Sequence, residues 1–217
     1  MMLNYIIVIL ISYLIGSFPT ALIFNKLVNK IDPRKVGSKN LGALNTLRIT
    51  SKAKGTIAGI FAFLSVFLID AFKGAFSVWL AMQLIPENAI LAGVLAAFFS
   101  ILGHNYSILI KFDGGRGAAT FLGILLFLNW RMFFLWLAIV LLFMLIFELF
   151  IPVKTKPSII RSAISDQIIG RLFGEAAAVI PFYFIDPLIF YISLLCTPLI
   201  IIRHIDRINK QVKDYKK

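Results

Sequence analysis

Apolar runs separated by short polar segments occupy most of the 217-residue chain. An α-helix rises 1.5 Å per residue, so about twenty apolar residues cross a hydrocarbon layer about 30 Å thick. Most runs reach that length and two are short. They predict an all-α integral membrane protein with about seven transmembrane helices, at Tyr5 to Phe24, Thr56 to Ile85, Ala89 to Gly103, Ala118 to Leu128, Met132 to Ile151, Ile159 to Phe182 and Ile185 to Ile202.

The composition agrees with a membrane protein. Hydrophobic residues make up 60% of the chain and charged residues 15%, whereas a soluble domain is about 45 to 50% apolar. The formal net charge is +12. Because most of the chain is committed to apolar runs, this basic excess belongs to loops and does not indicate a nucleic-acid partner. We expect one domain over residues 1–217.

The basic residues predict the topology. Of the 22 Lys and Arg residues, 19 fall between Lys26 and Lys54, at Lys111 and Arg116, between Lys154 and Arg161, or after Ile202. Basic loops stay in the cytoplasm, so we expect the N-terminus outside and the C-terminus in the cytoplasm. A five-span alternative joins Ala118 to Ile151 into one tilted helix and merges the last two runs. It places Lys154 outside, against the charge rule, and a turn at residues 129–131 is favoured instead.

The segment Lys35 to Arg48 is polar although it lies between two predicted spans. Its glycines allow positive φ and close approach to a ligand. Ser38, Asn40 and Asn45 add neutral donors, and Arg48 adds a planar guanidinium group. This combination favours a ligand that carries phosphate. The alternative is an ordinary hydrophilic loop with turn residues.

A second polar segment, Gly103 to Thr120, places the turn Gly114-Gly115-Arg116-Gly117 directly before an apolar helix. Free N–H groups at a helix start favour an anion, and Arg116 adds charge. The spacing is not that of a Walker A motif. Taken alone, the turn is also compatible with a simple tight loop.

Four ionisable residues are further candidates. Asp70 and Lys73 are three positions apart in a predicted span, hence on one helix face. Charged groups at membrane depth are costly and mark candidate sites, although the pair can also neutralise itself or Lys73 can extend towards the interface. His104 and His204 each follow a span and can carry a proton or donate to phosphate, or serve only as structural hydrogen-bonding groups.

Two features concern packing. Gly170 and Gly174 have the GxxxG spacing that lets membrane helices approach closely. Cys196 is the single cysteine, so no disulfide can form within the chain, and we expect it to be buried.

Five motifs follow one another along nearly the whole chain: GSFP in the first span, GSxNxGAxNxxR in the first cytoplasmic loop, DxxKG in the second span, GH ahead of GG(K/R)GxAT, and a basic RHxxxI tail. In this order they resemble the bacterial acyl-phosphate-dependent glycerol-3-phosphate acyltransferases. The resemblance implies transfer of a fatty acyl group from acyl phosphate to the 1-hydroxyl of sn-glycerol 3-phosphate. The products are lysophosphatidate and inorganic phosphate, in the first acylation of phospholipid biosynthesis. It also implies a multi-pass protein of the bacterial cell membrane with a cytoplasmic active site.

The resemblance assigns roles to individual residues. Ser38 and Arg48 match positions that bind substrate phosphate, Arg116 matches a lysine, and His204 matches an active-site histidine. The chain departs from the family at four positions, with Lys39 for Gly, Leu44 for Thr, Arg116 for Lys and Arg207 for Asn. We predict catalytic roles for Ser38, Arg116 and His204. The predicted substrate-binding residues are Ser38, Asn40, Gly42, Ala43, Asn45, Arg48, Lys73, His104, Gly114, Gly115, Arg116, Gly117 and Thr120.

No serine nucleophile elbow and no HxxxxD motif appears, so we expect direct attack by the glycerol hydroxyl without an acyl-enzyme. The expected partners are glycerol 3-phosphate, acyl phosphate, membrane lipid and, transiently, the soluble enzyme that makes acyl phosphate. We expect no cofactor and no metal site. We also expect Ser38, Arg48, Arg116 and His204 to converge in one pocket at the inner leaflet. The alternative is a small polytopic anion transporter, which the absence of a repeated half disfavours.

Overall fold

The computed structural model describes residues 2–150 and 167–215, and all helices and strands named below belong to them. These residues form two compact units, one ending at Leu128 and the other beginning at Asn129, which are described separately. The predicted helix start at Ile159 and the basic residues Lys154 and Arg161 lie outside the described residues. Regular structure in the described part of the chain is helical, with an isolated β-bridge between Ser107 and Asp113.

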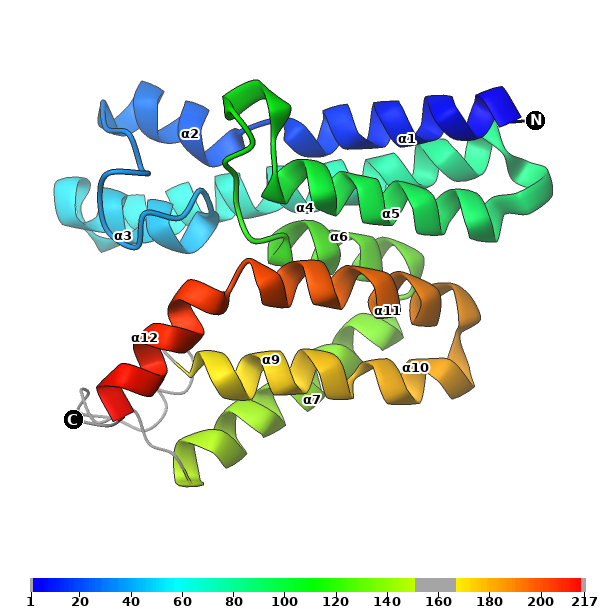
Figure 1. The fold of residues 1–217 in the computed structure, drawn as a ribbon. Helices are drawn as coiled ribbons and strands as arrows, with labels where there is room; N and C mark the ends of the chain where they lie inside the picture. The colour runs from blue at the N-terminus through cyan, green and yellow to red at the C-terminus, as the bar shows by residue number, and fades with distance from the viewer. Residues whose placement is uncertain (1, 151–166, 216–217) are drawn as a thin grey trace. The chain divides into compact units, whose positions relative to one another are not determined.

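Unit 1 contains the first four predicted spans and both glycine-rich segments (Figure 1). Pro19 interrupts the first span, because proline lacks the N–H that a continuous helix needs. The elements are α1 (Met2–Ser17), α2 (Thr20–Phe24), the π-helix η1 (Asn25–Asn29), α3 (Ala43–Lys54), α4 (Thr56–Leu84), the 3₁₀ turn η2 (Pro86–Asn88), α5 (Ala89–Asn105), the 3₁₀ turn η3 (Ile108–Ile110) and α6 (Ala118–Leu128).

Small residues bring the helices of unit 1 together. A methyl group on Gly16 of α1 would overlap the backbone of Ser100 of α5, and one on Gly123 of α6 would overlap that of Ala71 of α4. α1 therefore packs on α5 and α4 on α6 at backbone contact distance. The opposite side of α4 exposes an apolar stripe of helical spacing that suits lipid, formed by Ile57, Phe61, Leu64, Leu68 and Phe72.

Unit 2 contains α7 (Trp130–Phe150), α9 (Ile168–Ala177), α10 (Val179–Ile185), α11 (Pro187–Ile202) and α12 (Ile205–Tyr215). The prediction for the GxxxG spacing is confirmed. A methyl group on Gly170 would lie 2.8 Å from the carbonyl oxygen of Phe143, and one on Gly174 would lie 2.6 Å from Cα of Val140, so α9 packs on α7 through its glycines. Cys196 is buried as predicted.

The membrane class is confirmed, while the count of seven spans stays a prediction. Within residues 2–150 and 167–215, five helical stretches are long and apolar enough to cross a bilayer, and the bent pair Pro187–Ile202 and Ile205–Lys213 makes up to six. The 11 residues of α6 rise only about 16 Å. The continuous helix of the five-span alternative is wrong, because α6 ends at Leu128 and α7 begins at Trp130.

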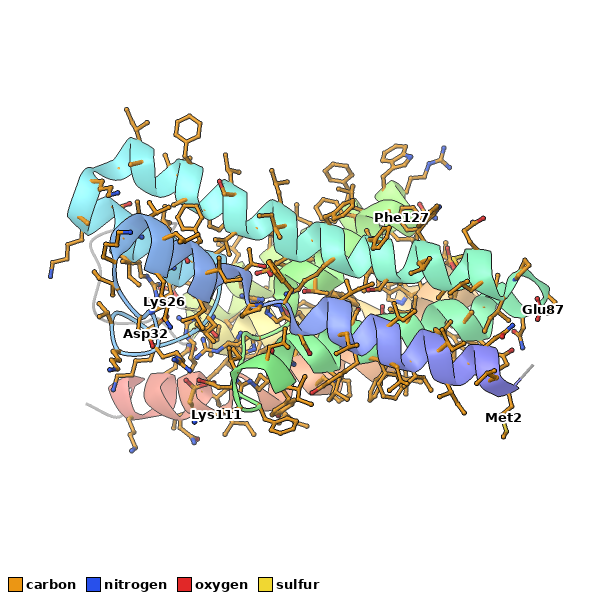
Figure 2. All side chains as sticks on the ribbon, turned by 90° about the horizontal axis from the view of Figure 1, so that it is seen from above. Met2, Lys26, Asp32, Glu87, Lys111 and Phe127 are labelled. Atoms are coloured by element: carbon orange, nitrogen blue, oxygen red, sulfur yellow. The ribbon has the colours of Figure 1, made fainter. Side chains whose placement is uncertain are left out.

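The polar loops of unit 1 gather at one end. Figure 2 shows Lys26, Asp32 and Lys111 at one end of the unit and Met2 and Glu87 at the other. Cationic loops that share an end agree with the predicted topology, in which they share a membrane face. The assignment of that face to the cytoplasm stays a prediction.

Candidate active site

Asn45 organises the first glycine-rich segment. Its side chain is fully buried, and its Nδ2 lies 3.0 Å from the carbonyl oxygen of Pro33 and 3.1 Å from those of Val36 and Asn40. Its Oδ1 accepts a hydrogen bond from the backbone N–H of Ser38 at 2.8 Å. One amide thus gathers the loop around itself, while the predicted role of Asn45 in substrate binding stays a prediction.

Two residues in this loop have a left-handed backbone. Gly37 has φ of +67° and Lys39 has φ of +58°. A methyl group on Gly37 would also overlap Oδ1 of Asn45, so only glycine fits there. At Lys39, where the resembling family has glycine, the lysine adopts the conformation that glycine adopts most readily.

The segment expected to be a loop up to Arg48 is helical from Ala43 onward, as α3. Gly42 precedes this helix in an extended conformation. Buried residues at positions 43, 46 and 50 give α3 one inward face, which explains why the polar sequence is helical. Arg48 is exposed on the other side. Ala43 is buried in an apolar cluster, so its side chain is a packing group.

A neighbouring ion pair shapes the entrance to this loop. The carboxylate of Asp32 accepts hydrogen bonds from the guanidinium of Arg34 at 2.7 Å and from its backbone N–H at 3.0 Å. These bonds lower the pKa of Asp32 to about 2, and the same pair raises the pKa of Arg34. Asp32 thus stays ionised and paired near neutral pH.

The second segment has the predicted glycine turn followed by a helix. Gly117 has φ of +81°, and α6 begins at the next residue. The N–H of Gly115 donates to the carbonyl of His104 at 2.9 Å. A methyl group on Gly115 would overlap Nε2 of His104 and lie 2.7 Å from the carbonyl oxygen of Leu41. Glycine is therefore required where the turn meets both His104 and the first segment.

A buried charged cluster lies beside this contact. Oδ1 of Asp70 lies 2.8 Å from Nζ of Lys73 and 3.7 Å from Nδ1 of His104, and it accepts a hydrogen bond from Oγ1 of Thr20 at 2.9 Å. Nζ of Lys73 also donates to the carbonyl of Phe18, at the break between α1 and α2, at 3.1 Å. At the break in the first span, the carbonyl of Phe18 and the hydroxyl of Thr20 thus form hydrogen bonds with the ion pair of α4.

A small pocket joins these groups. It brings together four of the predicted residues, Lys73, His104, Gly114 and Gly115, and Leu41 links it to the first segment. Its lining consists of Ser17, Phe18, Pro19, Thr20, Ala21, Leu41, Asp70, Lys73, His104, Ser107, Ile110, Gly114 and Gly115.

The remaining predicted residues lie elsewhere. Thr120 faces α4, where a methyl group on Gly74 would lie 2.7 Å from its Cγ2, so it is a packing residue outside the pocket lining. Ser38 and Arg116 are half-buried and belong to the segments that meet at the pocket. His204 is buried in unit 2, with Nδ1 2.8 Å from the carbonyl oxygen of Ile200. Its convergence with the residues of unit 1 stays a prediction.

Some pocket residues were not predicted to have a role in the site. Thr20 is one of them, and it donates to Asp70, a predicted candidate 50 positions away in the sequence. Ser107 donates to the carbonyl of Ser17 and closes another side. The GSFP motif could have pointed to these residues. A proline in an apolar span interrupts the helix, and the backbone carbonyls that it leaves unpaired need hydrogen bonds from polar side chains.

Comparison with known proteins gives concordant results. The family profile described as glycerol-3-phosphate acyltransferase matches residues 6–214. A glycerol-3-phosphate acyltransferase of Bordetella petrii is 45% identical over 118 residues, which are 54% of this chain and 52% of the relative. The chain thus aligns with about half the length of this relative. The Wolbachia pipientis enzyme of the same name is 37% identical over 201 residues, 93% of this chain and 91% of the relative.

The fold matches as well. The crystal structure of PlsY, an integral membrane glycerol 3-phosphate acyltransferase, in its glycerol 3-phosphate form superposes with a TM-score of 0.70. The superposition covers 97% of this chain and 93% of that one, at 22% identity. A second structure, the lysophosphatidic acid form, superposes equally well. From the profile over nearly its whole length and the full-length relative, this chain belongs to the glycerol-3-phosphate acyltransferase family.

Proposed function

We propose that this protein transfers a fatty acyl group from acyl phosphate to the 1-hydroxyl of sn-glycerol 3-phosphate, at the cytoplasmic face of the cell membrane. One observation supports the proposal most strongly. In this member of the family, the two glycine-rich segments meet at one polar pocket, where Leu41 of the first contacts Gly115 of the second. Both substrates carry phosphate, so two adjoining anion sites are needed.

The first segment suits the phosphate of glycerol 3-phosphate. Within residues 2–150 and 167–215, neither the hydroxyl of Ser38 nor the guanidinium of Arg48 has a hydrogen-bond or ion-pair partner. A guanidinium and a hydroxyl bind phosphate well, because their hydrogen bonds to an anion are charge-assisted.

The second segment suits the phosphate of the acyl donor. Gly115 brings the backbone close to His104, and Arg116 follows directly before the N-terminus of α6. Lys73 is held by only two acceptors in the described part of the chain, the carboxylate of Asp70 and the carbonyl of Phe18. An ammonium has three N–H donors, so one remains for a phosphate oxygen.

The chemistry needs orientation and charge stabilisation more than a protein nucleophile. The glycerol hydroxyl oxygen forms a bond to the acyl carbon, and the bond between that carbon and the phosphate oxygen breaks. The hydroxyl proton passes to the departing phosphate or to His204. Because acyl phosphate is already activated, aligning two anions and neutralising their charge lowers the barrier.

The identity of the proton acceptor is open to a direct test. If the departing phosphate takes the proton, a His204→Gln variant keeps kcat within about threefold of the parent. If His204 is the base, kcat falls about a hundredfold or more. The measurement is steady-state phosphate release at saturating concentrations of both substrates.

The proposed activity is tested with purified protein in detergent, supplied with acyl phosphate or, separately, acyl coenzyme A. We expect phosphate to be released from acyl phosphate only when glycerol 3-phosphate is present, together with lysophosphatidate, and no product from acyl coenzyme A. Product formed only from the thioester would refute the acyl-phosphate donor. Activity that needs sealed vesicles and yields no lysophosphatidate would instead indicate the anion transporter.

A further inference from the structure

A buried hydrogen-bond relay lies behind the pocket wall, outside the pocket lining. Nδ2 of Asn25 donates to the carbonyl of Ala21 and to Oγ1 of Thr46, both at 2.8 Å. The hydroxyl of Thr46 lies 3.2 Å from the carbonyl oxygen of Gly42 and donates to it. The side chains of Asn25 and Thr46 are fully buried. Nδ2 of Asn25 has one N–H for each of its two acceptors, and the hydroxyl of Thr46 has one for the carbonyl of Gly42, so the direction of the relay follows from the chemistry of the groups.

The two ends of the relay coincide with two walls of the pocket. Ala21 lines the pocket from α2, and Gly42 directly follows Leu41, which lines it from the first segment. Leu41 in turn contacts Gly115 through its carbonyl oxygen. The relay therefore sets the distance between α2 and the turn that closes the pocket.

The same helical turn also controls the residues proposed to bind glycerol 3-phosphate. Thr46 follows Asn45, whose amide gathers the loop that carries Ser38. Arg48 is two positions further along α3. A displacement of the first turn of α3 moves both proposed phosphate ligands together.

The backbone around Asn25 is adapted to this contact. Asn25 begins the five-residue π-helix η1, which is followed by Lys30 with φ of +56°. π-helical turns are rare and cost stability, so they persist where a side chain must be directed to a particular partner. A second rung, from Asn29 to Thr50 at 2.8 Å, lies one turn farther along α3.

From these contacts we infer that Asn25 and Thr46 are positioning residues for the glycerol 3-phosphate site. They bind no substrate atom and act by holding Leu41, Ser38 and Arg48 in place. The inference rests on the proposed function for its kinetic consequence, while its structural consequence is independent of the reaction.

The kinetic test compares Thr46→Val, which removes the hydroxyl and keeps the shape, with Thr46→Ser, which restores it. We expect Thr46→Val to raise KM for glycerol 3-phosphate about tenfold while kcat stays within about threefold, and Thr46→Ser to match the parent. The matched control is Thr50→Val, which breaks the second rung. We expect it to leave KM unchanged, although it removes an equally buried hydroxyl.

A second readout does not depend on activity. Leu41 is 5% exposed, so a Leu41→Cys reporter should react slowly with a maleimide. We expect adding Thr46→Val to speed the labelling about tenfold and adding Thr50→Val to leave it unchanged; buried Cys196 is replaced by Ala throughout.

The outcomes separate the two proposals. If Thr46→Val speeds the labelling of Leu41→Cys but the parent protein forms no lysophosphatidate, the proposed function is refuted and the positioning role is supported. Equal labelling and equal KM in the Thr46→Val and Thr50→Val proteins, with both only less stable to heat, would refute the positioning role.

Discussion

Nζ of Lys73 lies 2.8 Å from Oδ1 of Asp70, and the two side chains are only 6% and 2% exposed. Removing one partner leaves a buried charge without its counter-ion, which costs about 3 to 5 kcal/mol. We therefore expect Lys73→Met alone to destabilise the protein strongly and to abolish activity. Thermal unfolding in detergent, followed by phosphate release, measures both effects.

The double variant Asp70→Asn with Lys73→Met separates a structural clamp from a substrate-binding group. It removes both charges, so most of the stability should return. We expect kcat/KM to remain at least about tenfold below the parent, because the third N–H of Lys73 is still missing. Full activity in this variant would mean that the pair serves only the fold.

Of the glycine-to-alanine substitutions at the pocket, we expect Gly115→Ala to reduce activity most. The new Cβ would overlap Nε2 of His104 and press on the carbonyl of Leu41. Misplacing a substrate-aligning wall by about 1 Å can cost about a hundredfold in rate, and we expect a loss of that size in kcat/KM. Parent-like turnover in Gly115→Ala would exclude this contact from the active site.

Lys39→Gly should stabilise the protein. A left-handed backbone costs a residue with a Cβ about 1 kcal/mol, and glycine removes this cost. Part of the gain is lost because glycine has more conformational freedom in the unfolded chain. We expect the free energy of unfolding to rise by about 0.5 kcal/mol, seen as a higher Tm. The same change at exposed Lys35, whose φ is negative, should lower Tm. An equal shift in both variants would contradict the explanation.

Arg48→Ala should act mainly on substrate binding. The guanidinium has no partner among the described residues, so its removal disturbs no internal contact. Loss of a charge-assisted phosphate contact is worth about 2 to 3 kcal/mol, and we expect KM for glycerol 3-phosphate to rise about a hundredfold with kcat nearly unchanged. Lys52→Ala, an exposed cation one turn along α3, is the control. If the KM of Arg48→Ala stays at the parent value, Arg48 is not a phosphate ligand.

Features that depend on near neighbours in the chain were predicted correctly. Within the described residues, the apolar runs are helical, because hydropathy over twenty residues decides whether a segment suits lipid. Gly170 and Gly174 packed α9 on α7 because residues four apart share a helix face. The Gly114 to Gly117 turn precedes α6 as expected, since glycine there permits a backbone that other residues resist.

Internal contacts of two predicted binding residues could not be predicted from their residue types. The side chain of Asn45 holds the loop together and Thr120 packs against Gly74, while their roles in substrate binding stay predictions. The polar composition of Lys35 to Arg48 suggested a loop, whereas the buried face of α3 stabilises a helix over its second half. The amide of Asn45 is satisfied by carbonyls 5 to 12 positions away, whereas the hydroxyl of Thr120 is buried without a hydrogen-bond partner among the described residues.

By itself, the sequence determined that this protein lies in a membrane, where its long apolar helices are and, through the order of its motifs, its family. Only the tertiary structure decided which polar groups meet. Thr20 reaches Asp70 across 50 positions and Asn25 reaches Thr46 across 21. Such contacts depend on how glycine-lined helices settle against one another in three dimensions. A buried donor forms a hydrogen bond with whichever acceptor the packing brings within about 3 Å. The hydropathy of the sequence does not predict which acceptor that is.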